Sequence, residues 1–200
     1  MAPMESLWRI SKMYGVTQAE IMRINNIKNP NEIRVGQKLT IPHATPPQSY
    51  IPLYPNNKWS YIVIHHTASD IGNARLVDMW HKKRGFWNGL GYHFLIDNGT
   101  VNKGDGQIEI SPRWIKQQNG AHCKAANMNE KAIGIALVGN FSKTQPSPRQ
   151  MESLVFLVTE LMNYYNIPSS RVIGHRDACG ANTECPGTRF PWNEFKRRIS

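Results

Sequence analysis

Residues 43–57 constrain the fold of this chain more than any other stretch, because they carry four prolines and no charged residue. Proline lacks the backbone N–H that helix interiors and central strands need, so no regular element can run through this segment. A stretch of this kind forms an extended, semi-stiff linker. The chain is therefore predicted to fold as two units, residues 1–42 and 58–200, on either side of the linker.

The pattern of residues 1–42 predicts a small α+β unit. Apolar residues recur at helical spacing after Leu7. Thr17 can cap a second helix, because Glu20 three residues later completes a capping box. Residues 38–41 then read as a short strand.

The larger unit alternates short apolar strands with helices. Ser147 and Pro148 form a strong helix start, and the apolar positions after them follow a period of three and four residues. Strands are predicted at 61–65, 92–96, 132–138 and 172–173, and helices at 73–84, 147–165 and 192–199. This alternation predicts an α/β fold in which helices flank a mixed central sheet.

The charge of the chain limits its partners. The formal net charge is +10, but the basic residues are spread over both units, without an arginine-rich arm or a basic helix. We therefore expect a generally basic surface that suits an anionic polymer, not a nucleic-acid-binding protein. No apolar run approaches the ~18 residues of a membrane span, so no membrane insertion is expected. The first ten residues lack a signal-peptide pattern, which predicts synthesis in the cytoplasm.

Three separate parts of the chain offer metal ligands. His175 follows a short strand in the string GHRD, and Cys185 begins the string CPG ten residues later. Cys179 is an alternative sulfur, although the turn after Cys185 favours that residue. The third ligand is His65 or His66; neighbouring strand residues point to opposite faces, so only one of the two can take part. Two histidines and one cysteine leave a fourth position on zinc open, which indicates hydrolysis.

The remaining cysteines do not indicate a disulfide framework. The count of three is odd. With Cys185 on the metal, we expect Cys123 and Cys179 to be reduced, small buried residues; the alternative is a pair between them in an oxidising setting.

Four other histidines have less specific surroundings. His43 lies in the linker and His81 among lysines and arginine, so we expect both to be solvated. His93 falls in a predicted strand and is a candidate for burial. His122 lies in a Gly-Ala-His-Cys loop, where a structural role and a place in a cleft are equally plausible.

Residues 58–193 resemble a known enzyme family. The matching strings, in order, are VIHHTAS, GLGYHFLIDNGT, GAHCKAANMNEKAIGIALVGNF, GHRD and TECPG. They resemble the type 2 N-acetylmuramoyl-L-alanine amidases, which include phage lysins and animal peptidoglycan recognition proteins. The resemblance implies that His65 binds zinc together with His175 and Cys185.

The resemblance also implies roles for side chains around the metal. One branch of the family has a glutamate where this chain has Ala136, so that carboxylate is absent here. The other branch uses a tyrosine and a residue two positions before the ligand cysteine, which correspond to Tyr92 and Thr183. A core aromatic and a turn residue are the alternatives for these two. His122 and Asn127 are implied to contact substrate.

Residues 5–42 resemble a LysM module, a βααβ unit that binds glycans containing N-acetylglucosamine. The string VGQKLTIP at its end carries the resemblance. Only four residues precede the match, so the usual first strand is expected to be missing and glycan binding by this module is an open question.

Together these features predict a zinc-dependent amidase that cuts peptidoglycan between N-acetylmuramic acid and L-alanine. It would be a monomer that reaches the cell wall after release or export. A relative that only binds peptidoglycan is the main alternative, and such relatives typically lack the ligand cysteine that is present here as Cys185. A hydrolase of soluble muropeptides is a third possibility, less consistent with a wall-binding module.

Overall fold

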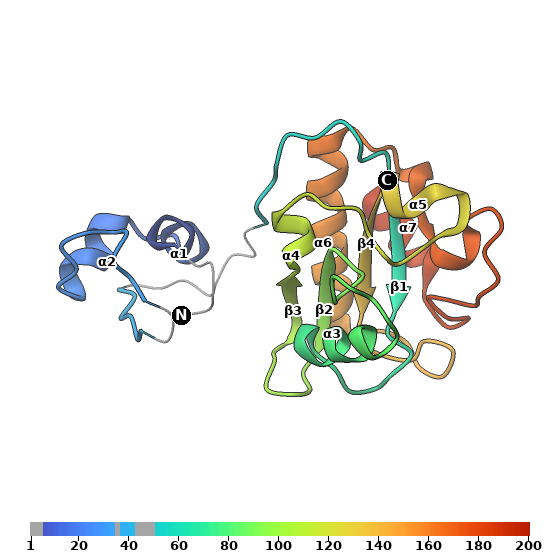
Figure 1. Ribbon diagram of the computed structural model, residues 1–200, viewed down its shortest axis with the longest axis horizontal. Coiled ribbons are helices and arrows are strands. Elements are labelled where there is room, and N and C mark those ends of the chain that lie inside the picture. The colour runs from blue at the N-terminus through green and yellow to red at the C-terminus, as the bar shows by residue number, and fades with distance from the viewer. Residues whose placement is uncertain (1–5, 35–36, 43–50) are drawn as a thin grey trace. The chain divides into compact units, whose positions relative to one another are not determined.

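The computed structural model describes residues 6–34, 37–42 and 51–200, and the chain divides into two compact units, Met1–Pro52 and Leu53–Ser200 (Figure 1). The division falls inside the predicted linker, most of which lies outside the described residues, as does His43. The second unit begins earlier than expected. Tyr54 accepts a hydrogen bond from the hydroxyl of Tyr165 through its backbone oxygen (2.8 Å), which ties this stretch to the larger unit.

The described part of the smaller unit contains two helices, α1 (Leu7–Tyr14) and α2 (Gln18–Ile24). The predicted capping box is present: the Thr17 hydroxyl accepts from the Glu20 backbone, and the Glu20 carboxylate accepts from the Thr17 backbone. Apolar side chains from both helices and from the turn between them form a small core of Leu7, Ile10, Val16 and Ile21.

The predicted strand at residues 38–41 is wrong, because the structure assigns no strand there. The backbone of Thr40 hydrogen-bonds to the Asn25 side chain instead of to a neighbouring strand. The Asn25 amide donates to the Thr40 oxygen and the Asn25 side-chain oxygen accepts from the Thr40 N–H, both at 2.7 Å. The first strand of the module would fall on residues 1–4, which lie outside the described residues.

The larger unit, described throughout from residue 53, is built on a five-stranded mixed sheet, as predicted. Its order is β3-β2-β4-β1-β5, and only β3 runs antiparallel to its neighbour. The strands are β1 (Tyr61–His66), β2 (Phe94–Asn98), β3 (Asp105–Ile110), β4 (Ala132–Leu137) and β5 (Val172–Gly174).

The burial of each strand explains whether the sequence pattern predicted it. β4 is buried along its whole length, as expected for a central parallel strand, so its sequence is a continuous apolar run. β3 was not predicted. Its sequence, DGQIEI, is largely polar because it lies at the edge of the sheet with several positions partly or fully exposed.

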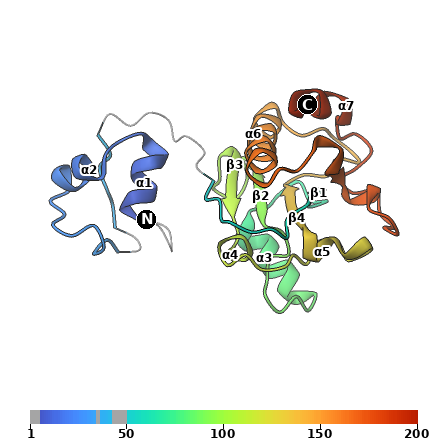
Figure 2. The same cartoon turned by 90° about the horizontal axis from the view of Figure 1, so that it is seen from above.

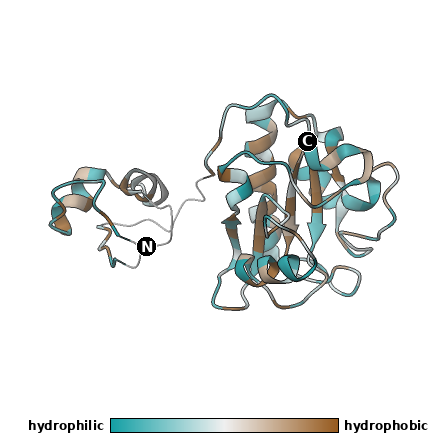
Figure 3. Ribbon diagram, in the orientation of Figure 1, coloured by the Kyte–Doolittle hydropathy of each residue, from teal (hydrophilic) through white to brown (hydrophobic). Residues whose placement is uncertain are grey.

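Helices cover both faces of this sheet (Figures 1 and 2). On one face lies the long helix α6, with α7 beside it, and on the other lies α3 (Figure 2). Figure 3 shows hydrophobic residues concentrated along the central strands and on parts of α6. The helices of this unit are α3 (Ala74–Lys83), α4 (Pro112–Ile115), α5 (Met128–Lys131), α6 (Pro148–Tyr165) and α7 (Trp192–Ile199).

Helix α6 follows the predicted pattern closely. Ser147 caps it, Pro148 occupies its first turn, and Gln150 completes the capping box. The side chains of Leu154, Val158 and others at the same spacing are buried against the sheet. Among the described residues, no helix is both long enough and apolar enough to cross a membrane.

Candidate metal centre

Two of the predicted ligands meet because of strand register. β1 and β5 are parallel neighbours, and Ile64 pairs with Gly174. The residue that follows each of them is a histidine: His65 is the second-last residue of β1, and His175 comes directly after β5. Their ring centroids are 4.7 Å apart. The pair therefore sits at the carboxyl ends of adjacent parallel strands, where open α/β sheets generally bind their ligands.

A hydrogen-bonded loop brings Cys185 to these two histidines. The Arg176 backbone N–H donates to the Cys185 oxygen (2.8 Å), and the Arg176 side chain donates to the Gly187 oxygen (3.2 Å). The backbone N–H of His66 points at the sulfur, 3.4 Å from Sγ. These contacts hold the ligand loop against the ends of β1 and β5.

The resulting donor set fits zinc. The ligand atoms of His65, His175 and Cys185 all lie within 4.8 Å of one another. Nδ1 of His65 and Sγ of Cys185 are 3.6 Å apart. Zinc–nitrogen and zinc–sulfur bonds of ordinary length at a tetrahedral angle span about 3.6 Å between the two ligand atoms. His65 and Cys185 are buried, whereas His175 is half-buried.

Burial sets the protonation of the three ligands. It lowers the pKa of His65 and of His175, so both rings are neutral and carry a lone pair for a metal at neutral pH. Burial raises the pKa of the Cys185 thiol to about 12 in the absence of a cation. A divalent metal would reverse this preference, because a coordinating thiol loses its proton.

The structure shows which of the two candidate histidines and which of the candidate cysteines lie in the cluster. Nδ1 of His66 accepts a hydrogen bond from the Phe141 N–H (3.0 Å), away from the ligand cluster. Cys123 is buried as expected. The expectation that Cys179 is buried is wrong, because it lies on an exposed loop and is not part of the cluster.

Tyr92 packs beside the ligands. It precedes β2 rather than lying in it, and its ring centroid is 5.1 Å from that of His65. Burial raises the pKa of its phenol above the ordinary value. Tyr92 therefore keeps its proton at physiological pH, and its O–H can donate a hydrogen bond to a negatively charged oxygen.

Thr183 has a defined place in the ligand loop. Its hydroxyl oxygen accepts a hydrogen bond from the Cys185 backbone N–H (3.1 Å), which is the bond expected of a turn residue. The side chain is exposed, and its O–H proton is still available to donate.

The two residues implied to contact substrate differ in exposure. Asn127 is exposed, with φ of 57°, and its side chain makes no cap hydrogen bond to α5. His122 is buried, and its Nδ1 lies 3.0 Å from Nε2 of His65. The structure thus places His122 against His65, a candidate metal ligand, rather than on an open surface.

His81 is a residue whose position the sequence analysis missed, since it is buried rather than solvated. Its Nδ1 accepts from the Gly91 N–H (2.9 Å), and its ring packs 5.3 Å from that of Tyr92. The available signal was spacing: His81 lies four residues after the buried Val77 and so shares its helix face.

His93 makes the stability of this unit sensitive to acid. It is fully buried, with Nδ1 accepting from the Gly134 N–H, and burial lowers its pKa to about 4. The unfolded chain takes up a proton near pH 6.5, whereas the folded chain does so only near pH 4, so folding stability is lost as pH falls through this window.

We therefore expect the free energy of unfolding to fall by as much as about 3 kcal/mol from this residue between pH 7 and pH 4. Urea denaturation of the metal-free protein across this range, compared with His93→Asn, measures the contribution. Parallel stability curves for the two proteins would contradict it.

Comparison with known proteins identifies the family of both units. Residues 55–188 match the N-acetylmuramoyl-L-alanine amidase family, and residues 3–42 match the LysM domain. Peptidoglycan-recognition protein SC2 of Drosophila melanogaster is 33% identical over 149 residues, which cover 70% of this chain and 74% of that protein.

Solved structures show the same relationship. N-acetylmuramoyl-L-alanine amidase LysC from Clostridium intestinale URNW is 36% identical, with a TM-score of 0.58 over 76% of this chain and 94% of that chain. Wild-type Drosophila PGRP-LB is 26% identical, with a TM-score of 0.52 over 67% of this chain and 78% of that chain. The chain therefore belongs to the N-acetylmuramoyl-L-alanine amidase family and carries a LysM domain before its amidase domain.

Proposed function

We propose that this protein is a zinc-dependent peptidoglycan hydrolase that cleaves the amide bond between N-acetylmuramic acid and L-alanine. The observation that carries this proposal is the convergence of His65, His175 and Cys185 at the carboxyl ends of β1 and β5. Two imidazoles and a thiolate hold zinc with three protein ligands and leave a fourth position open, as in catalytic zinc sites.

The surroundings of each proposed ligand favour metal binding. The two imidazoles are neutral because burial lowers the pKa of each. The Cys185 sulfur is oriented by the His66 backbone N–H, which stabilises the thiolate form. Zinc bound there would polarise the substrate carbonyl and lower the pKa of water toward ~7.

Tyr92 and Thr183 are proposed to assist the reaction with hydroxyl donors. The Tyr92 phenol remains protonated and lies beside His65, so it can donate to the carbonyl oxygen as that atom gains negative charge. The Thr183 hydroxyl oxygen accepts a hydrogen bond from the Cys185 N–H, and its own proton is proposed as a second donor to the substrate. Ala136, the register partner of His65 on β4, supplies no carboxylate.

The proposed substrate is the polymeric cell wall. Asn127, exposed on the segment before α5, is proposed to contact it. The LysM domain is proposed to bind the glycan strands, and the net charge of +10 favours an anionic wall. The protein would act there as a monomer after release or export from the cytoplasm.

A second candidate is a protein that binds peptidoglycan without cutting it. The name of the similar Drosophila protein, peptidoglycan-recognition protein, favours this reading. Against it, all three ligand residues are present here with their donor atoms converged.

Incubation of the purified protein with cell walls tests the proposal. We expect new free amino groups on L-alanine, detected by N-terminal labelling, without new reducing sugar ends. A chelator should stop the release and added zinc should restore it, because the chemistry depends on the bound cation. Sedimentation with walls but no new amino ends, in a protein loaded with zinc, would establish the non-catalytic alternative instead.

A further inference from the structure

The hydrogen bonds of His122 determine which ring nitrogen of His65 carries the proton. Nε2 of His122 lies 3.3 Å from the backbone oxygen of Ala132, which can only accept, so this nitrogen carries the proton. Two ring nitrogens in hydrogen-bond contact cannot both carry a proton, so the lone pair of the His122 ring lies on Nδ1. Nδ1 faces Nε2 of His65 at 3.0 Å, so His65 donates from Nε2.

These two hydrogen bonds leave only one tautomer for a neutral His65. With its proton on Nε2, a neutral His65 has its lone pair on Nδ1. Nδ1 is the atom that lies 3.6 Å from the Cys185 sulfur. The nitrogen that can bind a cation therefore faces the Cys185 sulfur, and the nitrogen that cannot bind one faces His122.

The ring of His122 occupies a slot walled by two glycines. A Cβ added to Gly134 would lie 2.4 Å from Cδ2 of His122, and one added to Gly120 would lie 2.3 Å from the same atom. Neither distance is possible for real carbon atoms. Gly134 is part of the buried strand β4, so the sheet itself leaves room for this ring.

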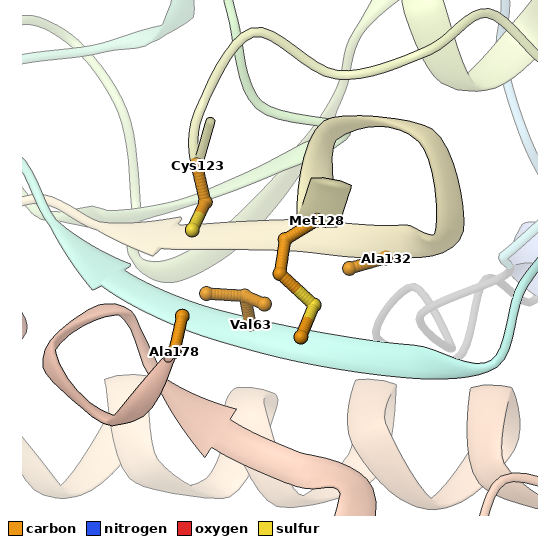
Figure 4. Packing of buried hydrophobic residues seen from close by; sticks show 5 residues of the cluster. All are labelled: Val63, Cys123, Met128, Ala132 and Ala178. Carbon is orange, nitrogen blue, oxygen red and sulfur yellow. The ribbon is translucent and has the colours of Figure 1, made fainter. Parts of the chain in front are cut away.

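The loop that carries His122 is clamped as well. The Asn129 side-chain oxygen accepts from the N–H groups of both His122 and Cys123, each at 2.7 Å, and the Asn129 backbone oxygen accepts from Gly120. Cys123 then packs over Val63 together with Ala178, which follows the His175 turn (Figure 4). This cluster joins the His122 loop and the His175 loop on β1.

We propose that His122 is a positioning residue for the metal, which fixes the ring and the tautomer of His65 so that Nδ1 is directed at the cation. This inference rests on the proposed zinc site and assigns His122 a role other than substrate contact. Metal-binding histidines generally donate their second nitrogen to an acceptor, often a carboxylate. A neutral imidazole supplies the same orientation without adding negative charge next to the cation.

Zinc affinity, measured by competition with a chromogenic chelator, tests the proposal without reference to activity. We expect His122→Leu to bind zinc about 10–100-fold more weakly than the wild type, because the acceptor for His65 is lost. Asn places an oxygen close to the position of Nδ1, so His122→Asn should recover most of the affinity. His81→Asn is the matched control, because it removes another buried histidine that accepts from a backbone N–H, and it should bind zinc as the wild type does.

Gly134→Ala provides a second test that removes no polar group. Its added methyl group should displace the His122 ring and weaken zinc binding, whereas Gly104→Ala meets only ordinary contacts and should not. Wild-type affinity in both His122→Leu and Gly134→Ala, with circular dichroism showing folded proteins, would overturn the inference. If the wild type itself fails to bind zinc, the proposed zinc site is wrong; the two failures are therefore distinguishable.

Discussion

Replacing Cys185 with serine is expected to remove zinc from the purified protein and to lower amidase activity by about three orders of magnitude or more. Serine offers a hydroxyl that does not ionise readily in place of a thiolate, and two histidines alone hold zinc weakly. Loss of the cation removes several kcal/mol of charge stabilisation, and about 4 kcal/mol corresponds to a thousandfold in rate. Metal analysis together with the release of L-alanine amino groups measures both effects.

The chain contains a matched control for this substitution. Cys179 lies six residues before Cys185 but is exposed and outside the ligand cluster, so Cys179→Ser should keep both zinc and activity. Full activity of Cys185→Ser without bound zinc would remove the proposed metal centre. Equal loss in the two variants would show that the loop, rather than the sulfur ligand, is the sensitive feature.

Replacing Tyr92 with phenylalanine is expected to lower kcat by about 10²–10³ and to leave zinc content unchanged. The substitution removes only the phenolic O–H, and the loss of one donor to a developing oxyanion costs this much in other hydrolases. The ring itself, packed near His65 and His81, is preserved. Steady-state kinetics on solubilised peptidoglycan fragments, with zinc analysis of the same samples, gives both quantities.

Tyr164→Phe serves as the control for the loss of a tyrosine hydroxyl, because Tyr164 is exposed on α6. Unchanged kcat in Tyr92→Phe would exclude Tyr92 from the mechanism while leaving the ligand set intact. A fall in zinc content in that variant would instead indicate that the hydroxyl supports the metal site.

Local sequence signals predicted the elements that depend on local chemistry. The capping boxes at Thr17 and Ser147 are present, because a cap needs only side chains within four residues of one another. The buried strand β4 was equally clear from its unbroken apolar run. The edge strand β3 was missed because its sequence is largely polar. A strand was wrongly predicted at residues 38–41, where the Thr40 backbone hydrogen-bonds to the Asn25 side chain.

Histidine burial was harder to predict than ligand identity. His81 is followed by two lysines and an arginine in the sequence, but its side chain is buried because of its position on the helix. The loop composition around His122 left a structural role and a place in a cleft equally plausible. The structure buries the ring next to His65, because Gly134 of a strand distant in sequence leaves room for it. Such contacts depend on which loop covers which face of the sheet.

The sequence by itself determined the two-unit organisation around the proline-rich stretch, the α/β class and the residue types available to a metal. These follow from backbone chemistry and local periodicity, which act over a few residues. Only the tertiary structure decided that His65 faces His175 and Cys185, that His66 turns to Phe141, and that His122 supports His65. The physical reason is register: parallel strands more than one hundred residues apart in the chain must align before their end residues can share one cation.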